Sequence, residues 1–216
     1  MEELHRLAEL VMQRNLIDYQ IARILKMPAI QPYVARYIAA AIFGIELPSL
    51  ACSRGRFTQG ELAGKSVEIR WRAHRMKPVR FSPQIPNFCL VLTGAKVPLK
   101  SLDSNTRPLV IDAVHLFRVD ELIKEVSPPS LEWRFRQIVP AWLWEAAEVY
   151  PASRNPLLRL TEEQRELLEL FSSAEFESEL RWQAALERSQ EMLARMAGEA
   201  LRQYRRGETE PLICEQ

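Results

Sequence analysis

The sequence has few cysteines and few glycines, and neither type is spaced for a familiar cofactor site. Its three cysteines, Cys52, Cys89 and Cys214, are far apart and form no metal-ligand spacing. An odd number of separated thiols indicates a reducing compartment rather than a disulfide scaffold. Only 7 glycines occur, which disfavours a dinucleotide fold built on a glycine-rich turn. No glycine-rich phosphate loop, GxSxG elbow or HExxH motif is present, so no motif predicts a cofactor.

Long hydrophobic runs and an excess of charge of one sign are also missing. The longest apolar run, Tyr37 to Ile45, is too short to span a bilayer. The first residues are acidic and amphipathic, unlike a secretory signal, so we expect a cytoplasmic protein that does not contact membranes. The 29 Lys and Arg residues against 28 Asp and Glu give a net charge of +1. Any nucleic-acid site must therefore be a local basic patch.

Hydrophobic periodicity predicts a mixed α/β (α+β) fold. A hydrophobic fraction of 47% over 216 residues is ample for a core. Predicted helices cover residues 2–14, 19–26 (capped by Asp18), 32–43, 121–126, 140–150, a turn after the capping box at 161–164, and 174–206. Predicted strands cover residues 50–57, 66–73, 87–93 and 109–117. We expect N-terminal helices, a mixed central sheet and C-terminal helices in a domain over residues 1–171. A charged C-terminal helix and tail over 172–216 would follow it.

The stretch 66–72 alternates apolar and polar residues with the period of a half-buried strand. The side chains expected to face the core are Val67, Ile69 and Trp71. Those expected on the other face are Glu68, Arg70 and Arg72. A metal-dependent nuclease uses such a carboxylate to hold a divalent metal, and the nearby cation to orient water or phosphate. A solvated strand face with a weak ion pair gives the same spacing, so both interpretations stay open.

Basic residues crowd around this stretch. They are Arg54, Arg56, Lys65, Arg70, Arg72, His74, Arg75, Lys77 and Arg80. The aromatic residues Phe57, Trp71 and Phe81 are interleaved with them. A basic cluster with aromatics is typical of phosphate-backbone contact, although a solubilising surface has the same composition. We therefore treat this zone as a candidate binding site for DNA or RNA.

Three other features have a simple structural interpretation. Helices 19–26 and 32–43, joined by a short turn, superficially resemble a helix-turn-helix. The second helix, however, offers mainly Arg36 among alanines on its outer face, which disfavours base recognition. His115 lies in an apolar strand, where a histidine is more often paired within the core than catalytic. The tryptophans Trp142 and Trp144 are expected to pack rather than to stack on bases.

Several stretches resemble a bacterial family of uncharacterised proteins with the restriction-endonuclease-like, or PD-(D/E)xK, fold. They are residues 28–47, residues 56–71 with "LAGKSVEIRW", "NFCLVLTG", "RPLVIDAVHLF", "LWEAAEVYP" and "LTEEQRELLELF". Together they cover most of residues 15–171. The order of helices, a hairpin carrying Glu-x-cation, two buried strands and further helices is similar too. The resemblance implies a fold more than an activity, because the family's function is unassigned.

The resemblance also implies site residues. In that fold a helix often supplies an acid, a strand end supplies an Asp, and the next strand supplies Glu/Asp-x-Lys. Glu68 and Arg70 match the last element as candidate catalytic residues, with Arg in place of Lys. Arg54 stands where the Asp is expected, and Arg36 stands where relatives have Glu. Two carboxylates normally hold the divalent cation, and Arg titrates too high to be a general base.

These departures favour binding over cleavage. Arginines at positions 36, 54 and 70 would suit phosphate or carboxylate. The candidate nucleic-acid-binding residues are Arg36, Arg54, Arg56, Lys65, Arg72 and Arg75. An active nuclease that uses Glu68 and Mg²⁺ is the alternative, with Glu46 or Glu61 as a replacement acid. A third hypothesis is a scaffold that forms homo-oligomers or binds a partner protein through its C-terminal helix, because that helix has a thin apolar stripe.

Overall fold

A computed structural model of the chain describes residues 2–72, 85–94, 108–126 and 139–206. The chain divides into two compact units, Met1–Ser173 and Ala174–Gln216. This division lies two residues from the boundary expected from the sequence. Among the described residues, no helix is both long enough and apolar enough to cross a bilayer.

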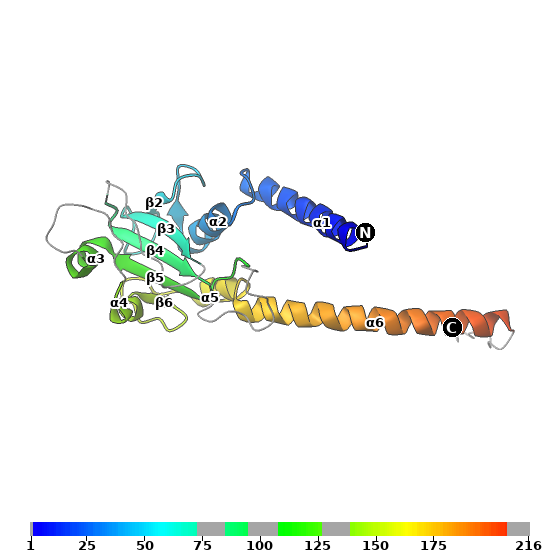
Figure 1. Cartoon of the computed structure of the whole chain (residues 1–216). Coiled ribbons are helices and arrows are strands. Elements are labelled where there is room, and N and C mark those ends of the chain that lie inside the picture. The colour runs from blue at the N-terminus through cyan, green and yellow to red at the C-terminus, as the bar shows by residue number, and fades with distance from the viewer. Residues whose placement is uncertain (1, 73–84, 95–107, 127–138, 207–216) are drawn as a thin grey trace, which may run out of the picture. The chain divides into compact units, whose positions relative to one another are not determined.

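The described elements run from one N-terminal helix through a sheet to a long C-terminal helix (Figure 1). In chain order they are α1 (Glu2–Leu25), α2 (Gln31–Phe43), β1 (Ile45–Glu46), β2 (Arg54–Phe57), β3 (Ser66–Arg72), β4 (Phe88–Thr93), β5 (Ala113–Arg118), α3 (Val119–Val126), α4 (Ala141–Ala146), β6 (Glu148–Tyr150), α5 (Glu162–Glu169) and α6 (Ser173–Arg205). The expectation of a mixed α/β chain with helices at both ends is confirmed.

The sheet has six strands in the order of the sequence, β1 to β6. Strands β3 and β4 are parallel, whereas every other neighbouring pair is antiparallel. The expected mixed sheet is therefore confirmed. A parallel pair requires a crossover between its strands, and here the connection includes residues 73–84, which lie outside the described residues.

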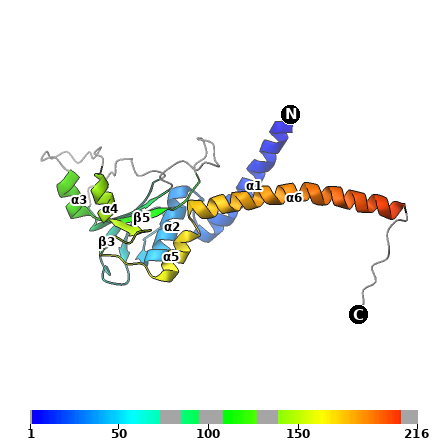
Figure 2. The same ribbon diagram turned by 90° about the horizontal axis from the view of Figure 1, so that it is seen from below.

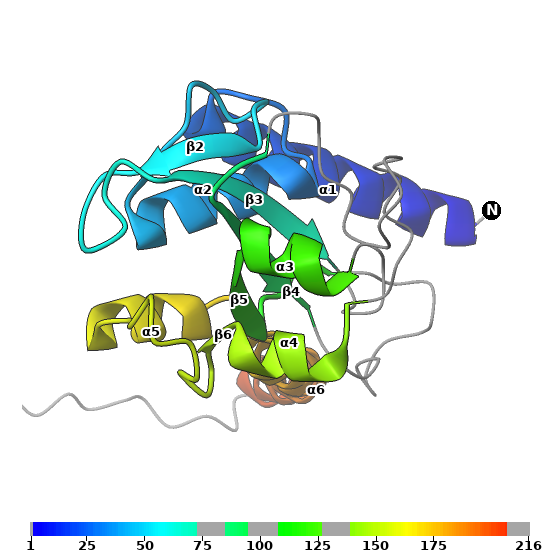
Figure 3. The ribbon, with the colours of Figure 1, turned by 90° about the vertical axis from the view of Figure 1, so that its left-hand side faces the viewer.

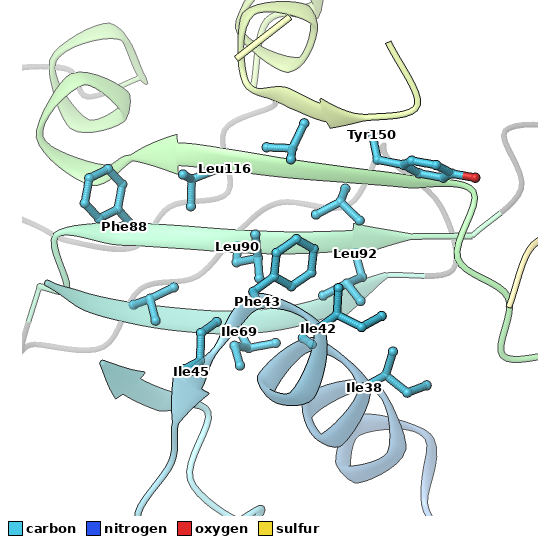
Figure 4. Close-up of a cluster of buried hydrophobic side chains, with 14 of the residues drawn as sticks. Ile38, Ile42, Phe43, Ile45, Ile69, Phe88, Leu90, Leu92, Leu116 and Tyr150 are labelled. Carbon is cyan, nitrogen blue, oxygen red and sulfur yellow. The ribbon is translucent and has the colours of Figure 1, made fainter. Parts of the chain in front are cut away.

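One face of the sheet forms the main core against α2. The helix buries Ala35, Ile38, Ala39, Ile42 and Phe43. Figure 4 shows Ile38, Ile42 and Phe43 over the strand residues of this face, which include Ile69, Leu90, Leu92 and Leu116. Helix α5 lies beside α2 (Figure 2), and Gln164 Nε2 donates to the Ile42 carbonyl at 2.6 Å.

The other face of the sheet is covered by α3 and α4 over β4 and β5 (Figure 3). Its apolar cluster includes Cys89, Val91 and Phe117 from the strands, with Leu122 and Trp144 from the helices. Strand β4 is buried over all six residues, as its continuous apolar sequence predicts. The strand residues of this cluster come from β4 and β5. On the same face, β2 and β3 carry charged side chains instead.

Local sequence signals explain where several elements begin and end. Helix α2 has Pro32 in its first turn and ends at Gly44, whose φ of 60° suits a residue without a Cβ. The predicted capping box forms at α5, where the Thr161 hydroxyl accepts from the Gln164 backbone and the Gln164 side chain accepts from the Thr161 backbone.

Some predicted elements were wrong. The separate helices 2–14 and 19–26 are one helix, α1, so Asp18 is no cap; it pairs with Arg14 at 3.5 Å one turn earlier. The predicted helix 140–150 ends at Ala146, and its last residues form β6 on the edge of β5. Trp142 is exposed rather than packed, unlike the buried Trp144. The strand predicted at 50–57 begins only at Arg54, and β1 was not predicted.

A substitution at Gly55 tests how closely β1 approaches β2. A Cβ at this position would lie 2.2 Å from the Glu46 carbonyl oxygen. This oxygen belongs to the backbone of β1, which cannot move away without a cost in free energy. We expect Gly55→Ala to lower the free energy of unfolding by about 1–3 kcal/mol, measured by urea denaturation. Gly198→Ala in α6 is the matched control, because a Cβ there meets nothing within 4 Å. An unchanged midpoint for Gly55→Ala would contradict this packing.

Candidate functional site

The site is built around Glu68, a carboxylate that the pleat of β3 directs away from the main core. Its neighbours Val67 and Ile69 face α2, so Glu68 points to the opposite face, where it is only 5% exposed. Arg70 Nη2 donates to Glu68 Oε1 at 2.7 Å. Arg54 Nε lies 3.9 Å from Glu68 Oε2. The Ser53 hydroxyl donates to Oε1 at 3.4 Å.

The sheet register explains this grouping. Arg54 of β2 is the cross-strand partner of Glu68 in β3, and such partners have neighbouring side chains on one face. Arg70 follows Glu68 by two residues and so shares that face. A buried carboxylate needs a close counter-ion to offset its desolvation, and here two guanidinium groups supply it. Their side chains remain 24% exposed for Arg54 and 16% exposed for Arg70.

Two further arginines lie on the same face by strand alternation. Arg72 follows Arg70 by two residues on β3 and is half-buried, whereas Arg56 follows Arg54 on β2 and is exposed. Arg56 Nη1 donates to the Gly64 carbonyl at 3.0 Å. We call the residues Arg54, Arg56, Arg70 and Arg72 the arginine face. Among the described residues, these four guanidinium groups accompany the carboxylates of Glu68 and of Glu46, the exposed cross-strand partner of Arg56, so the described charges of this face sum to a net positive charge.

Arg36 does not join this group. Its Nη1 donates to the carbonyls of Leu50 and Ala51 at 2.7 and 2.9 Å, and its guanidinium lies 5.6 Å from the centroid of the Tyr33 ring. These contacts bind α2 to the loop that precedes β2. The structure therefore brings Arg54 and Arg70 together at Glu68, whereas the guanidinium of Arg36 binds backbone carbonyls of the loop before β2.

The remaining predicted basic residues are separate from the arginine face. Lys65 is exposed in the turn before β3. It lines a cavity of about 450 Å³ with Asn87, Arg118 and Asp120 among others. Arg118 is already paired there with Asp120 at 3.1 Å and with Glu121 at 3.2 Å. Arg75 lies outside the described residues, as do His74, Lys77 and Arg80.

The aromatic residues predicted to accompany the basic cluster face the core instead. Phe57 is 2% exposed and belongs to the main core. Trp71 packs against the same core, and its Nε1 donates to the Val110 carbonyl at 3.4 Å. Phe81 lies outside the described residues. Phe57 and Trp71 therefore offer no stacking platform on the arginine face.

Glu46 and Glu61, the acids considered from the sequence as partners of Glu68, are not cross-strand neighbours of Glu68 in the sheet. Glu46 of β1 pairs in register with Arg56, which in turn pairs with Ser66 rather than Glu68. Glu61 is exposed in the connection between β2 and β3. Within the ranges that the structure describes, no three His, Cys, Asp or Glu side chains lie together as metal ligands. The charged side chains that contact Glu68 are cations, so this donor set does not fit a divalent metal.

Cys89 of β4 is the other cross-strand neighbour of Glu68. It is fully buried. Burial raises the pKa of its thiol to about 12, with smaller influences from the charges of Arg70, Glu68 and Arg72. The thiol is therefore unreactive and only lines the site. Ser53, which donates to Glu68, was missed because no pattern marks it in the sequence.

His115 is a core residue, as predicted. It is fully buried on β5. Its Nδ1 lies 3.0 Å from the Trp144 carbonyl oxygen, so this nitrogen carries the proton that the carbonyl accepts. The imidazole also meets the Trp144 ring edge to face, at 4.8 Å between centroids.

Comparison with protein-family models, curated proteins and solved structures gave no match.

Glu68 provides a stability test of this ion-pair cluster. Glu68→Ala leaves Arg54 and Arg70 without their buried counter-ion, so we expect the free energy of unfolding to fall by about 3 kcal/mol. Glu46→Ala removes an exposed carboxylate from the same sheet and serves as the control. Denaturant unfolding of both variants measures the difference. Equal stability of the two variants would show that Glu68 is not held as described.

Cys89 provides a chemical test of burial. Iodoacetamide should alkylate Cys89 at least about a hundredfold more slowly than the half-buried Cys52 in the folded chain at about pH 8, because the thiolate is the reactive form. Peptide mass spectrometry distinguishes the two thiols, and equal labelling would contradict the burial.

The pH dependence of stability is a second test of the same burial. Because the folded chain keeps the Cys89 proton to higher pH than the unfolded chain, the free energy of unfolding should fall as pH rises from about 9.

Proposed function

We propose that this chain binds a nucleic acid, through its phosphate backbone, on the arginine face of β2 and β3, and does not cleave it. The observation that carries the proposal is the ion-pair cluster of Arg54, Glu68 and Arg70. One buried carboxylate fixes two partly exposed guanidinium groups in place, and Arg56 and Arg72 extend the positive charge along the same face.

The chemistry of the side chains supports phosphate as the bound group. Arginine is always charged, is more weakly hydrated than lysine, and presents several planar donors to an oxyanion. Glu68 holds Arg54 and Arg70 in place before binding, which reduces the ordering cost when a ligand arrives. With four guanidinium groups against the two carboxylates of Glu68 and Glu46, positive charge remains among the described residues to attract a polyanion in a chain that is almost neutral overall.

We propose further that unit Met1–Ser173 has a restriction-endonuclease-like core. The element order on which the resemblance rested is present, namely α2, the β2–β3 hairpin with Glu68-x-Arg70, and the buried strands β4 and β5. In such a fold the β2–β3 hairpin would face nucleic acid. The site residues would then form a nuclease site in which Arg54 stands in place of the expected Asp.

The donor set argues for binding rather than metal-dependent cleavage. A divalent cation at phosphate needs more than one oxygen ligand from the protein, whereas the charged groups in contact with Glu68 are Arg54 and Arg70. Binding a cation would require Glu68 to exchange its 2.7 Å bond to Arg70 for the metal. Arginine cannot take the proton of an attacking water, and Glu68, the one carboxylate of the three residues, is already paired with both guanidinium groups.

The face also indicates which part of the nucleic acid is bound. Phe57 and Trp71 belong to the main core, so base stacking, which contributes to single-strand recognition elsewhere, is not available from them. Guanidinium groups on a strand face suit phosphate contacts, which position a protein without reading sequence. We therefore expect little sequence preference and a strong dependence on salt.

Fluorescence anisotropy with mixed-sequence DNA and RNA oligonucleotides tests the proposal. We expect binding at low salt that weakens steeply as salt rises, through release of counter-ions. Arg56→Gln with Arg72→Gln should weaken binding, and the slope of log K against log salt should fall by about 2. These two arginines are chosen because they are not the ion-pair partners of Glu68.

Arg159→Gln, an exposed arginine outside the arginine face, is the matched control and should leave the slope unchanged. Absence of binding at low salt, or binding without salt dependence, would overturn the proposal. So would cleavage in Mg²⁺ or Mn²⁺ that disappears in Glu68→Gln, because that result would make Glu68 a metal ligand.

A further inference from the structure

Helix α6 carries an exposed apolar stripe. Its members are Trp182, Leu186, Leu193, Met196 and Tyr204. At about 100° per residue these positions fall within an arc of roughly 80° to 100° on one side of the helix. Small residues, Ser189 and Ala200, fill the gaps in the same stripe. The side chains of the stripe are 47–74% exposed, although the stripe is more apolar than a solvated helix requires.

Within residues 174–206, the described part of the unit Ala174–Gln216, nothing covers this stripe. Its described part is a single helix, and a lone helix cannot bury its own apolar face. Most helical stability in proteins comes from packing of such a face, not from helix propensity. A contiguous exposed apolar strip of this kind marks an interaction surface.

The charges of α6 indicate which occupant fits. The first half is acidic, with Glu175, Glu177, Glu179 and Glu187 against Arg181 and Arg188. The second half is basic, with Arg195, Arg202 and Arg205 against Glu191 and Glu199. A second α6 laid antiparallel would bring each acidic half beside a basic half. A parallel pair would instead place like charges together along the whole helix.

We propose that α6 pairs with the α6 of a second copy of this chain as an antiparallel, two-fold symmetric homodimer. The stripe then behaves as a short coiled-coil seam with apolar residues at spacings of four and three. With the two-fold axis near residue 191, Leu186 faces Met196 of the second copy. Trp182 faces Ala200, and Leu193 faces Ser189. In two of these three pairings a bulky residue faces a small one, which suits close packing.

The seam variant Leu186→Glu with Leu193→Glu tests the pairing in the full chain by sedimentation equilibrium. The wild-type chain should be a dimer at micromolar concentration. The variant should weaken the dimer at least about a hundredfold, because each dimer loses four buried leucines. Ala184→Glu, on the opposite and exposed side of the helix, adds one negative charge without touching the seam and should leave the dimer intact.

A charge variant tests the orientation. Glu179→Gln with Glu187→Gln removes two acids from the first half of α6, which should weaken an antiparallel dimer and tighten a parallel one. A wild-type monomer at about 100 μM would overturn the proposal, and would indicate that another segment or a different protein covers the stripe. A dimer that survives Leu186→Glu with Leu193→Glu, or that tightens in the charge variant, would overturn it too.

Discussion

The two-sided character of β3 is the constraint on which unit Met1–Ser173 depends. Val67 and Ile69 can be buried against α2 only if Glu68 and Arg70 turn to the other face of the sheet. On that face a carboxylate is stable only beside cations, because burial removes it from water. Arg70 on the same strand and Arg54 on the neighbouring strand supply them at 2.7 and 3.9 Å. The core and the charged site are thus two consequences of one strand register.

The division of the second sheet face follows from the same constraint. Helices α3 and α4 cover β4 and β5, where Cys89, Val91 and Phe117 are apolar. Their apolar cover would be a poor neighbour for guanidinium groups, which need polar surroundings or water. The arginine face is therefore confined to β2 and β3. A near-neutral chain can in this way carry a local positive field, which the overall charge of +1 conceals.

Strong periodicity made much of the fold predictable, whereas pairing between distant residues did not. Strands β3 and β4 and helix α6 were predicted within about one residue of their ends, because each has a long regular pattern. Strands β1 and β6 have two and three residues and exist only because neighbouring strands pair with them, so no local pattern marks them. The pairing of Glu68 with Arg70 follows from their spacing, but that with Arg54 depends on the β2–β3 register. The contact of Arg36 with the Leu50 and Ala51 carbonyls depends on the path of a loop, which sequence patterns do not encode.

The two units have different proposed roles. The first would supply a phosphate-binding face, and the second would pair copies of the chain. Linking two binding faces in one assembly raises the effective affinity for a long polyanion, provided that both can engage it at once. Neither proposal depends on the other, because the arginine face and the apolar stripe of α6 share no residues.

The most direct test of the central claim is an NMR titration of the arginine side-chain Nε–H signals with a short oligonucleotide. The account predicts that the signals of Arg54, Arg56, Arg70 and Arg72 shift together and saturably, while that of Arg36, whose guanidinium binds the Leu50 and Ala51 carbonyls, stays in place. Shifts confined to arginines elsewhere in the chain, or no shift in the arginine face at saturating ligand, would contradict it.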